Sequence, residues 1–214
     1  TFVCKEFLKL KKKHNITAVV ETGSCLFSST KWFGENFDKV YTVEINEEFA
    51  KHGRHKVENL NVKSYISDSV SWLYTLENEL KHEKCIFFLD AHWGSNCPLK
   101  EEINAIGRLN LTQPPLIVIH DFYTGNPELG YDEYNGQPFT WDWILENVYF
   151  VGHKYSSIYD YYFNTQAEGA KRGVIYLYPK QYYSNSALNE SLTECYQNMN
   201  HILEYGEFKY PEYE

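Results

Sequence analysis

The stretch VVETGSCLFSST, residues 19–30, begins with β-branched residues, reaches an acid and continues into a loop of small residues. Runs of this kind favour buried strands, and glycine and serine favour turns. In open α/β sheets, ligands bind outside the carboxyl ends of the strands, which is where this loop would lie. The stretch therefore predicts a first strand followed by a ligand-binding loop.

Helices and strands are expected to alternate outward from this stretch. Apolar residues at helical spacing predict a helix over residues 2–10, and the spacing that follows predicts strands at 39–45, 61–67, 84–90 and 114–121. Helices are expected at 28–37, 46–60, 69–80 and after 96–102, with Asn46 as a cap and Pro98 in a first turn. Continuously apolar strands between amphipathic helices imply a parallel sheet covered on both faces.

The pattern changes after Asp121. Residues 122–143 are rich in glycine, proline and aromatic residues without a clear period, which predicts a long lid or substrate loop before a short helix at 141–148. Two strands at 154–163 and 172–179 are joined by a linker too short for a helical crossover, so they are expected to pair antiparallel. The tail, 181–214, carries a helical apolar stripe. We expect one Rossmann-like, doubly wound α/β domain over 1–214, with an amino-terminal helix within 1–14 and a mostly parallel seven-stranded sheet closed by an antiparallel hairpin.

Charge and composition limit the partners. The net charge of −9 opposes binding to a phosphate backbone, so nucleic acid is not expected as a partner. No apolar run approaches the roughly 20 residues of a membrane span, so no membrane partner is expected. Five scattered cysteines without a CxxC pair indicate neither a zinc site nor a disulfide framework, and a reducing, cytoplasmic location is expected. The sequence permits a homodimer without specifying one.

Four motifs, VETGSC, YTVEIN, ISDSVSWL and FFLDAHW, resemble those of class I S-adenosylmethionine-dependent methyltransferases over about residues 15–180. Within that fold, FLDAHW, CPLKEEINAI and AKRGVIYLYP look most like small-molecule O-methyltransferases of the catechol and macrocin types. The resemblance implies S-adenosylmethionine as cofactor and a small-molecule or sugar hydroxyl as acceptor. The chain departs from the family's glycine loop, because Cys25 and Phe27 stand where glycines are usual and Gly23 alone remains.

By this resemblance, Glu21 would face the methionine ammonium, Glu44 would accept the ribose hydroxyls, and Asp68 with Ser69 would meet the adenine. Glu44 follows Gly23 by about 20 positions, as the ribose-binding acid of dinucleotide folds does. Helix capping for Glu21 and Asp68, and a solvated acid for Glu44, are the structural alternatives. The expected cofactor residues are Glu21, Thr22, Gly23, Ser24, Ser29, Thr30, Glu44, Ile45, Asp68, Ser69 and Asp90.

Asp90 and Asp121 end the fourth and fifth strands, which are neighbours in this strand order. In catechol-type enzymes the matching acids hold a divalent ion such as Mg²⁺, and a third oxygen ligand follows the second acid, where this chain has Phe122. Asp132, Glu133 or water could complete a site on Asp90 and Asp121. Alternatively, His92 and His120 beside these acids suggest metal-free general-base chemistry, or are hydrogen-bonded core histidines. The expected catalytic residues are Asp90, His92, His120 and Asp121.

Aromatic residues gather around the expected mouth of the site. Trp93, Tyr123, Tyr131 and Trp141 would suit stacking against a sugar or aromatic acceptor, or are packing residues. The expected reaction is in-line displacement of the sulfonium methyl by an acceptor oxygen. A non-catalytic binding module on the same scaffold and a nicotinamide-dependent Rossmann oxidoreductase are the alternative functions.

Overall fold

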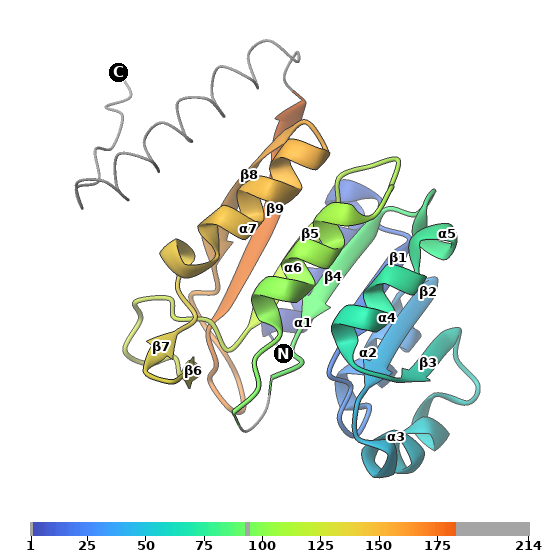
Figure 1. Ribbon diagram of the computed structural model, residues 1–214. Coiled ribbons are helices and arrows are strands. Elements are labelled where there is room, and N and C mark those ends of the chain that lie inside the picture. Colours follow the sequence, from blue (N-terminus) through green and yellow to red (C-terminus); the bar gives the residue numbers. More distant parts are fainter. Residues whose placement is uncertain (1, 93–94, 183–214) are drawn as a thin grey trace, which may run out of the picture.

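The computed structural model describes residues 2–92 and 95–182, in which seven strands form one sheet between helical layers (Figure 1). The strand order is β3-β2-β1-β4-β5-β9-β8, and β9 runs antiparallel to both of its neighbours. This order confirms the predicted fold class and places a topological switch point between β1 and β4, where such sheets bind ligands. The strands are β1 (Ala18–Thr22), β2 (Lys39–Glu44), β3 (Val62–Ile66), β4 (Cys85–Leu89), β5 (Leu116–His120), β8 (Ser157–Phe163) and β9 (Val174–Tyr182).

Helices cover both faces, because the central strands are apolar on both sides. One face packs against α4 (Ser69–Thr75), α5 (Glu77–Leu80), α6 (Leu99–Arg108) and α7 (Trp141–Lys154), and the other packs against α1 (Phe2–His14) and α2 (Ser28–Asn36). On that second face, Phe7, Phe33 and Phe88 meet with ring centroids 4.9–5.6 Å apart. Helix α3 (Glu47–Arg54) and the 3₁₀ turn η1 (His55–Val57) lie beside β3.

Most predicted elements are confirmed, and several boundaries differ. Asn46 caps α3 by accepting hydrogen bonds from the amides of Glu48 and Phe49. The helix expected over 69–80 breaks at Leu76, whose amide bonds to Leu73 in a tight turn. Pro98 stands at the N-cap position of α6, one residue before the first turn, and α7 continues to Lys154.

The loop after β5 contains a small hairpin that the apolar pattern of the sequence does not predict. Strands β6 (Glu133–Tyr134) and β7 (Gln137–Pro138) pair around Asn135 and Gly136, which have φ of 55° and 76°. Two left-handed residues are what a type I′ turn requires, and Asn-Gly is its commonest sequence. The sequence analysis placed no strand within this loop, although the Asn-Gly signal for the hairpin is present in the sequence.

The cysteines and the helix lengths can be compared with the expectations for the described residues. Cys4, Cys25, Cys85 and Cys97 are free thiols; Cys195 and the predicted tail helix lie outside the described residues. None of the described helices is both long and apolar enough to cross a bilayer.

Candidate functional site

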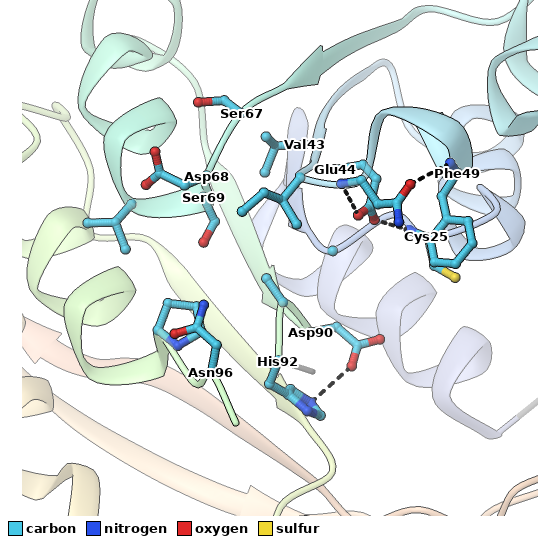
Figure 2. A pocket seen from close by; sticks show the side chains of 16 residues that line it. Cys25, Val43, Glu44, Phe49, Ser67, Asp68, Ser69, Asp90, His92 and Asn96 are labelled. Carbon is cyan, nitrogen blue, oxygen red and sulfur yellow. Dashed lines mark hydrogen bonds and ion pairs between the residues drawn. The ribbon is translucent and has the colours of Figure 1, made fainter. Parts of the chain in front are cut away.

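A pocket of about 430 Å³ opens at the carboxyl ends of β1, β2, β3 and β4, within the range of about 300–1,000 Å³ typical of small-molecule sites. Figure 2 shows Glu44 on one side, Asp68 and Ser69 on the other, and Asp90 with His92 at a third position. Of the predicted cofactor residues, the pocket is lined by Gly23, Glu44, Ile45, Asp68, Ser69 and Asp90.

The loop after β1 keeps a left-handed backbone without its usual glycines. Gly23 has φ 78°, and a Cβ built there would lie 2.4 Å from the carbonyl oxygen of Asp90, so only glycine lets the loop pass this close to β4. Cys25 and Phe27 have φ of 47° and 61°, in the region that glycine adopts at little cost. Both of these non-glycine positions therefore carry backbone strain.

Glu44 is held by the backbone at the end of β2. One carboxylate oxygen accepts a hydrogen bond from the amide of Cys25 at 2.7 Å, and the other accepts from the amide of Asn46 at 2.8 Å. Each oxygen has a second lone pair, so the carboxylate can still accept from two adjacent hydroxyls. Asp68 combines both of its predicted roles, since it lines the pocket while its side chain caps α4 through the amide of Ser71.

Five predicted cofactor residues are not part of the pocket lining: Glu21, Thr22, Ser24, Ser29 and Thr30. Glu21 is fully buried, and one oxygen accepts from the hydroxyls of Thr30 at 2.5 Å and Thr42 at 2.7 Å. Burial raises the pKa of Glu21, although these hydroxyls oppose the shift. The hydroxyl of Thr22 accepts from the amide of Asp90 at 3.3 Å, which ties β1 to the end of β4.

The four predicted catalytic residues come together. His92 Nε2 lies 3.4 Å from Asp90 Oδ1 and 3.2 Å from Asp121 Oδ2, and His120 Nδ1 lies 3.3 and 3.2 Å from the same two oxygens. Burial would lower the pKa of each imidazole, but the two carboxylates outweigh it and raise the pKa to about 9 for His92 and about 10 for His120. Burial would raise the pKa of Asp121, and the two imidazoles hold it far below its usual value.

An outer ring of side chains surrounds these four. Arg172, two residues before β9, forms ion pairs with Asp121 Oδ1 and Asp132 Oδ1. His92 Nδ1 lies 3.1 Å from Asp132 Oδ2 and 3.3 Å from the hydroxyl of Tyr134. The turn after β5 gives Asp121 a left-handed φ of 58°, and its carbonyl accepts from the amide of Asp132. Sequence reasoning missed Arg172, since only the folded sheet brings it here.

Glu102 on α6 is a further residue that sequence reasoning missed. Its side chain is fully buried, and one carboxylate oxygen has no hydrogen-bond partner among the described residues. Burial raises its pKa to about 7, although the hydroxyls of Ser69 and Thr22 oppose the shift. An acid on the apolar face of α6, beside Leu99 and Ile103, was the signal that could have revealed it.

The predicted acceptor residues divide into two groups. Tyr123 and Tyr131 are exposed and meet edge to face with ring centroids 4.8 Å apart. Trp141 stacks on Tyr161 at 4.2 Å and packs against the core, which favours the packing interpretation for it. Phe139 is fully buried between Tyr134 and Trp143 and packs edge to face on His92. Trp93 lies outside the described residues.

The structure is similar to solved methyltransferases. The O-methyltransferase TomG from Streptomyces achromogenes, solved with S-adenosylmethionine, matches 84% of this chain and 80% of its own with a TM-score of 0.60 and 13% identity. The O-methyltransferase from Bacillus cereus, solved with S-adenosylhomocysteine, matches 83% of this chain and 80% of its own, with a TM-score of 0.58 and 18% identity. The 23S rRNA methyltransferase ErmE matches 92% of this chain and 78% of its own, with a TM-score of 0.56 and 11% identity. No protein-family model and no curated protein sequence matches the chain. At these identities the similarity establishes the class I methyltransferase fold.

Proposed function

We propose that this protein is an S-adenosylmethionine-dependent methyltransferase that methylates a hydroxyl of a small molecule or sugar. One observation carries the proposal: a single pocket is lined by Glu44, positioned to accept from a ribose diol, and by Asp90 and His92 of the polar cluster. The fit to the cofactor is chemical as well as spatial, because a nucleoside with a cationic sulfonium suits a pocket bordered by the carboxylates of Glu44, Asp68 and Asp90.

S-adenosylmethionine supplies an activated methyl, and an acceptor oxygen displaces it in line, forming the C–O bond as the C–S bond breaks. The residues then have two tasks, which are to position the acceptor and to take up its proton. Of the three carboxylates in and around the cluster, Asp90 lines the pocket, and we assign the proton to it. Tyr123 and Tyr131 supply an exposed aromatic surface for the acceptor. The alternative of an imidazole base stays a prediction.

The Mg²⁺ ion of catechol-type enzymes suits this donor set poorly. Mg²⁺ prefers oxygen ligands in octahedral geometry. Here Phe122, which follows the second acid, is fully buried and offers no oxygen from its side chain, while two imidazole nitrogens face the carboxylates. No step is therefore assigned to Mg²⁺.

The non-catalytic alternative rests on the lost glycines, and the left-handed backbone at Cys25 and Phe27 removes much of its support.

The alternative of a nicotinamide-dependent oxidoreductase predicts that the pocket binds NAD and not S-adenosylmethionine. Calorimetric titration of the protein should show binding of S-adenosylmethionine and not of NAD. Glu44→Gln should weaken that binding at least about tenfold, or 1.4 kcal/mol, because the diol loses a charged acceptor. The exposed neighbour Glu48→Gln is the control and should bind normally. Binding of NAD alone would refute the proposal.

A further inference from the structure

We propose that Glu102 on α6 is a positioning residue for Asp90. Its buried carboxyl group holds the hydroxyl of Thr22, which accepts the amide of Asp90, and it also holds the hydroxyl of Ser69 on the wall of the pocket. The inference deepens the proposed function and rests on it for the role of Asp90 as the proton acceptor. The link between the residues is argued from burial, hydrogen bonding and the close approach of two strands.

Glu102 occupies a position that an apolar residue would be expected to fill. The face of α6 that packs into the core carries Leu99, Ile103 and Ile106 at helical spacing, and Glu102 lies on the same face with 1% of its surface exposed. Its Oε1 atom has no hydrogen-bond partner among the residues that the structure describes. A leucine would fill a similar volume without burying polar atoms, so the packing of α6 does not account for a carboxyl group here.

Hydrogen bonds connect this carboxyl group to both sides of the site. It bonds with the hydroxyls of Ser69 and Thr22, and both of these residues are buried. Thr22 ends β1, whereas Ser69 begins α4 and lines the pocket. Burial raises the pKa of Glu102 to about 7, so the group keeps its proton below that pH and can donate as well as accept. One side chain therefore links the end of β1 to the start of α4.

The step from Thr22 to Asp90 is short and leaves little room for movement. Thr22 pairs with Leu89, and its hydroxyl accepts from the amide of the next residue, Asp90, at 3.3 Å. Beyond this pair the strands approach so closely that a Cβ built on Gly23 would lie 2.4 Å from the carbonyl oxygen of Asp90. Because close-packed interiors transmit strain, a shift of Thr22 should be passed on to the backbone of Asp90.

The placement of Asp90 matters for the proposed chemistry. A general base must lie within hydrogen-bond reach of the proton that it accepts, and such sites tolerate about 0.5 Å of displacement. Glu102 and Thr22 do not line the pocket, so they can fix Asp90 without occupying the space of the acceptor.

Amide hydrogen exchange at Asp90 tests the link without a substrate. Exchange is followed by NMR at about pH 6, where Glu102 keeps its proton, with Ile86 in the middle of β4 as the internal reference. Glu102→Leu should speed exchange at Asp90 at least about tenfold relative to Ile86, because Thr22 loses its anchor. Glu102→Gln can still bond to both hydroxyls and should stay within about threefold of the parent. The exposed neighbour Glu101→Leu is the control and should exchange as the parent does.

Thermal melting separates the positioning of Asp90 from support of the whole fold. Glu102→Leu removes buried polar atoms together with their bonds, so it should melt within about 4 °C of the parent. A larger loss with equal acceleration at Ile86 and Asp90 would show general support of the fold and would overturn the inference. Unchanged exchange at Asp90 in Glu102→Leu, or exchange as fast in Glu102→Gln as in Glu102→Leu, would also overturn it. If Glu102→Leu does not fold, Glu102→Asp, which withdraws the carboxyl group by one methylene, decides on the same comparison.

Calorimetric titration of the same proteins with S-adenosylmethionine keeps the two proposals apart. Lack of binding by the parent refutes the proposed function, and exchange at Asp90 still decides whether Glu102 holds this residue. Binding by the parent together with unchanged exchange in Glu102→Leu refutes the positioning role alone.

Discussion

The cofactor half of the site and its chemical half are built in different ways. At the ends of β2 and β3, the carboxylates of Glu44 and Asp68 already accept hydrogen bonds from backbone amides. At the ends of β4 and β5, Nε2 of His92 and Nδ1 of His120 lie 3.2–3.4 Å from the carboxylates of Asp90 and Asp121, and Asp121 has a left-handed backbone. The first half is satisfied by its own chain. The second half is held together by ion pairs between charged side chains.

The two halves also differ in how far along the chain their contacts reach. Glu44 and Asp68 bond to amides two and three residues away, in addition to the amide of Cys25. Arg172 reaches Asp121 and Asp132 across 51 and 40 positions. Substitutions in the chemical half should therefore disturb both chemistry and stability, and those in the cofactor half should act locally.

The largest effect is expected from Asp90→Asn. Loss of the carboxylate that faces the pocket should lower the methyl-transfer rate by about 10²–10⁴-fold, because the acceptor hydroxyl keeps its proton. Formation of S-adenosylhomocysteine measures the rate at saturating S-adenosylmethionine, so that a change in cofactor affinity does not enter the comparison. Asp142→Asn, an exposed acid on α7, is the control. Full activity in Asp90→Asn would remove Asp90 from the mechanism.

Arg172→Gln should destabilise the fold by about 1–3 kcal/mol, because Asp121 and Asp132 would lose the guanidinium that holds them in a partly buried cluster. Urea unfolding gives the free energy. The matched control is Lys51→Gln, which breaks an exposed pair with Glu47 on α3 and should cost less than about 1 kcal/mol. Equal losses in the two variants would show that the cluster contributes no more than a surface ion pair.

Glu102→Gln should change how stability depends on pH. Burial raises the pKa of folded Glu102 to about 7, so between about pH 4.5 and 7 the folded state keeps a proton that the unfolded state releases. This group therefore stabilises the fold below about pH 4.5 relative to higher pH, and its contribution falls as pH rises to 7. Above pH 7 the Gln variant should be more stable than the parent by about 1–3 kcal/mol. Parallel stability curves for the two proteins would contradict the assigned pKa.

Cys25→Gly should give the smallest effect, a gain of about 0.5–1 kcal/mol in the free energy of unfolding. Cys25 has φ 47° and an exposed side chain, so glycine relieves strain and loses little packing. Cys25→Ala keeps the strain and should show no gain. If glycine gives no more stability than alanine, the loop is not strained at this position.

The contrast between the halves explains what the sequence could reveal. Strand ends such as Glu44, Asp90 and Asp121 follow from local apolar patterns, and parallel pairing then brings them to one edge of the sheet. The Asn135-Gly136 turn and the acid Glu102 on the apolar face of α6 left local signals, whereas the pairing of Arg172 with Asp132 depends on long-range packing. No local pattern fixes which distant side chain meets a given carboxylate, so the outer ring around His92 emerged only from the folded structure.

The most direct test of the central claim is a crystal structure of the protein with S-adenosylhomocysteine. We predict that the ribose hydroxyls lie within hydrogen-bond distance of Glu44, the adenine beside Asp68 and Ser69, and the sulfur facing Asp90. A nucleoside bound outside this pocket, or a sulfur directed away from Asp90, would contradict the account that one pocket joins cofactor binding to the polar cluster.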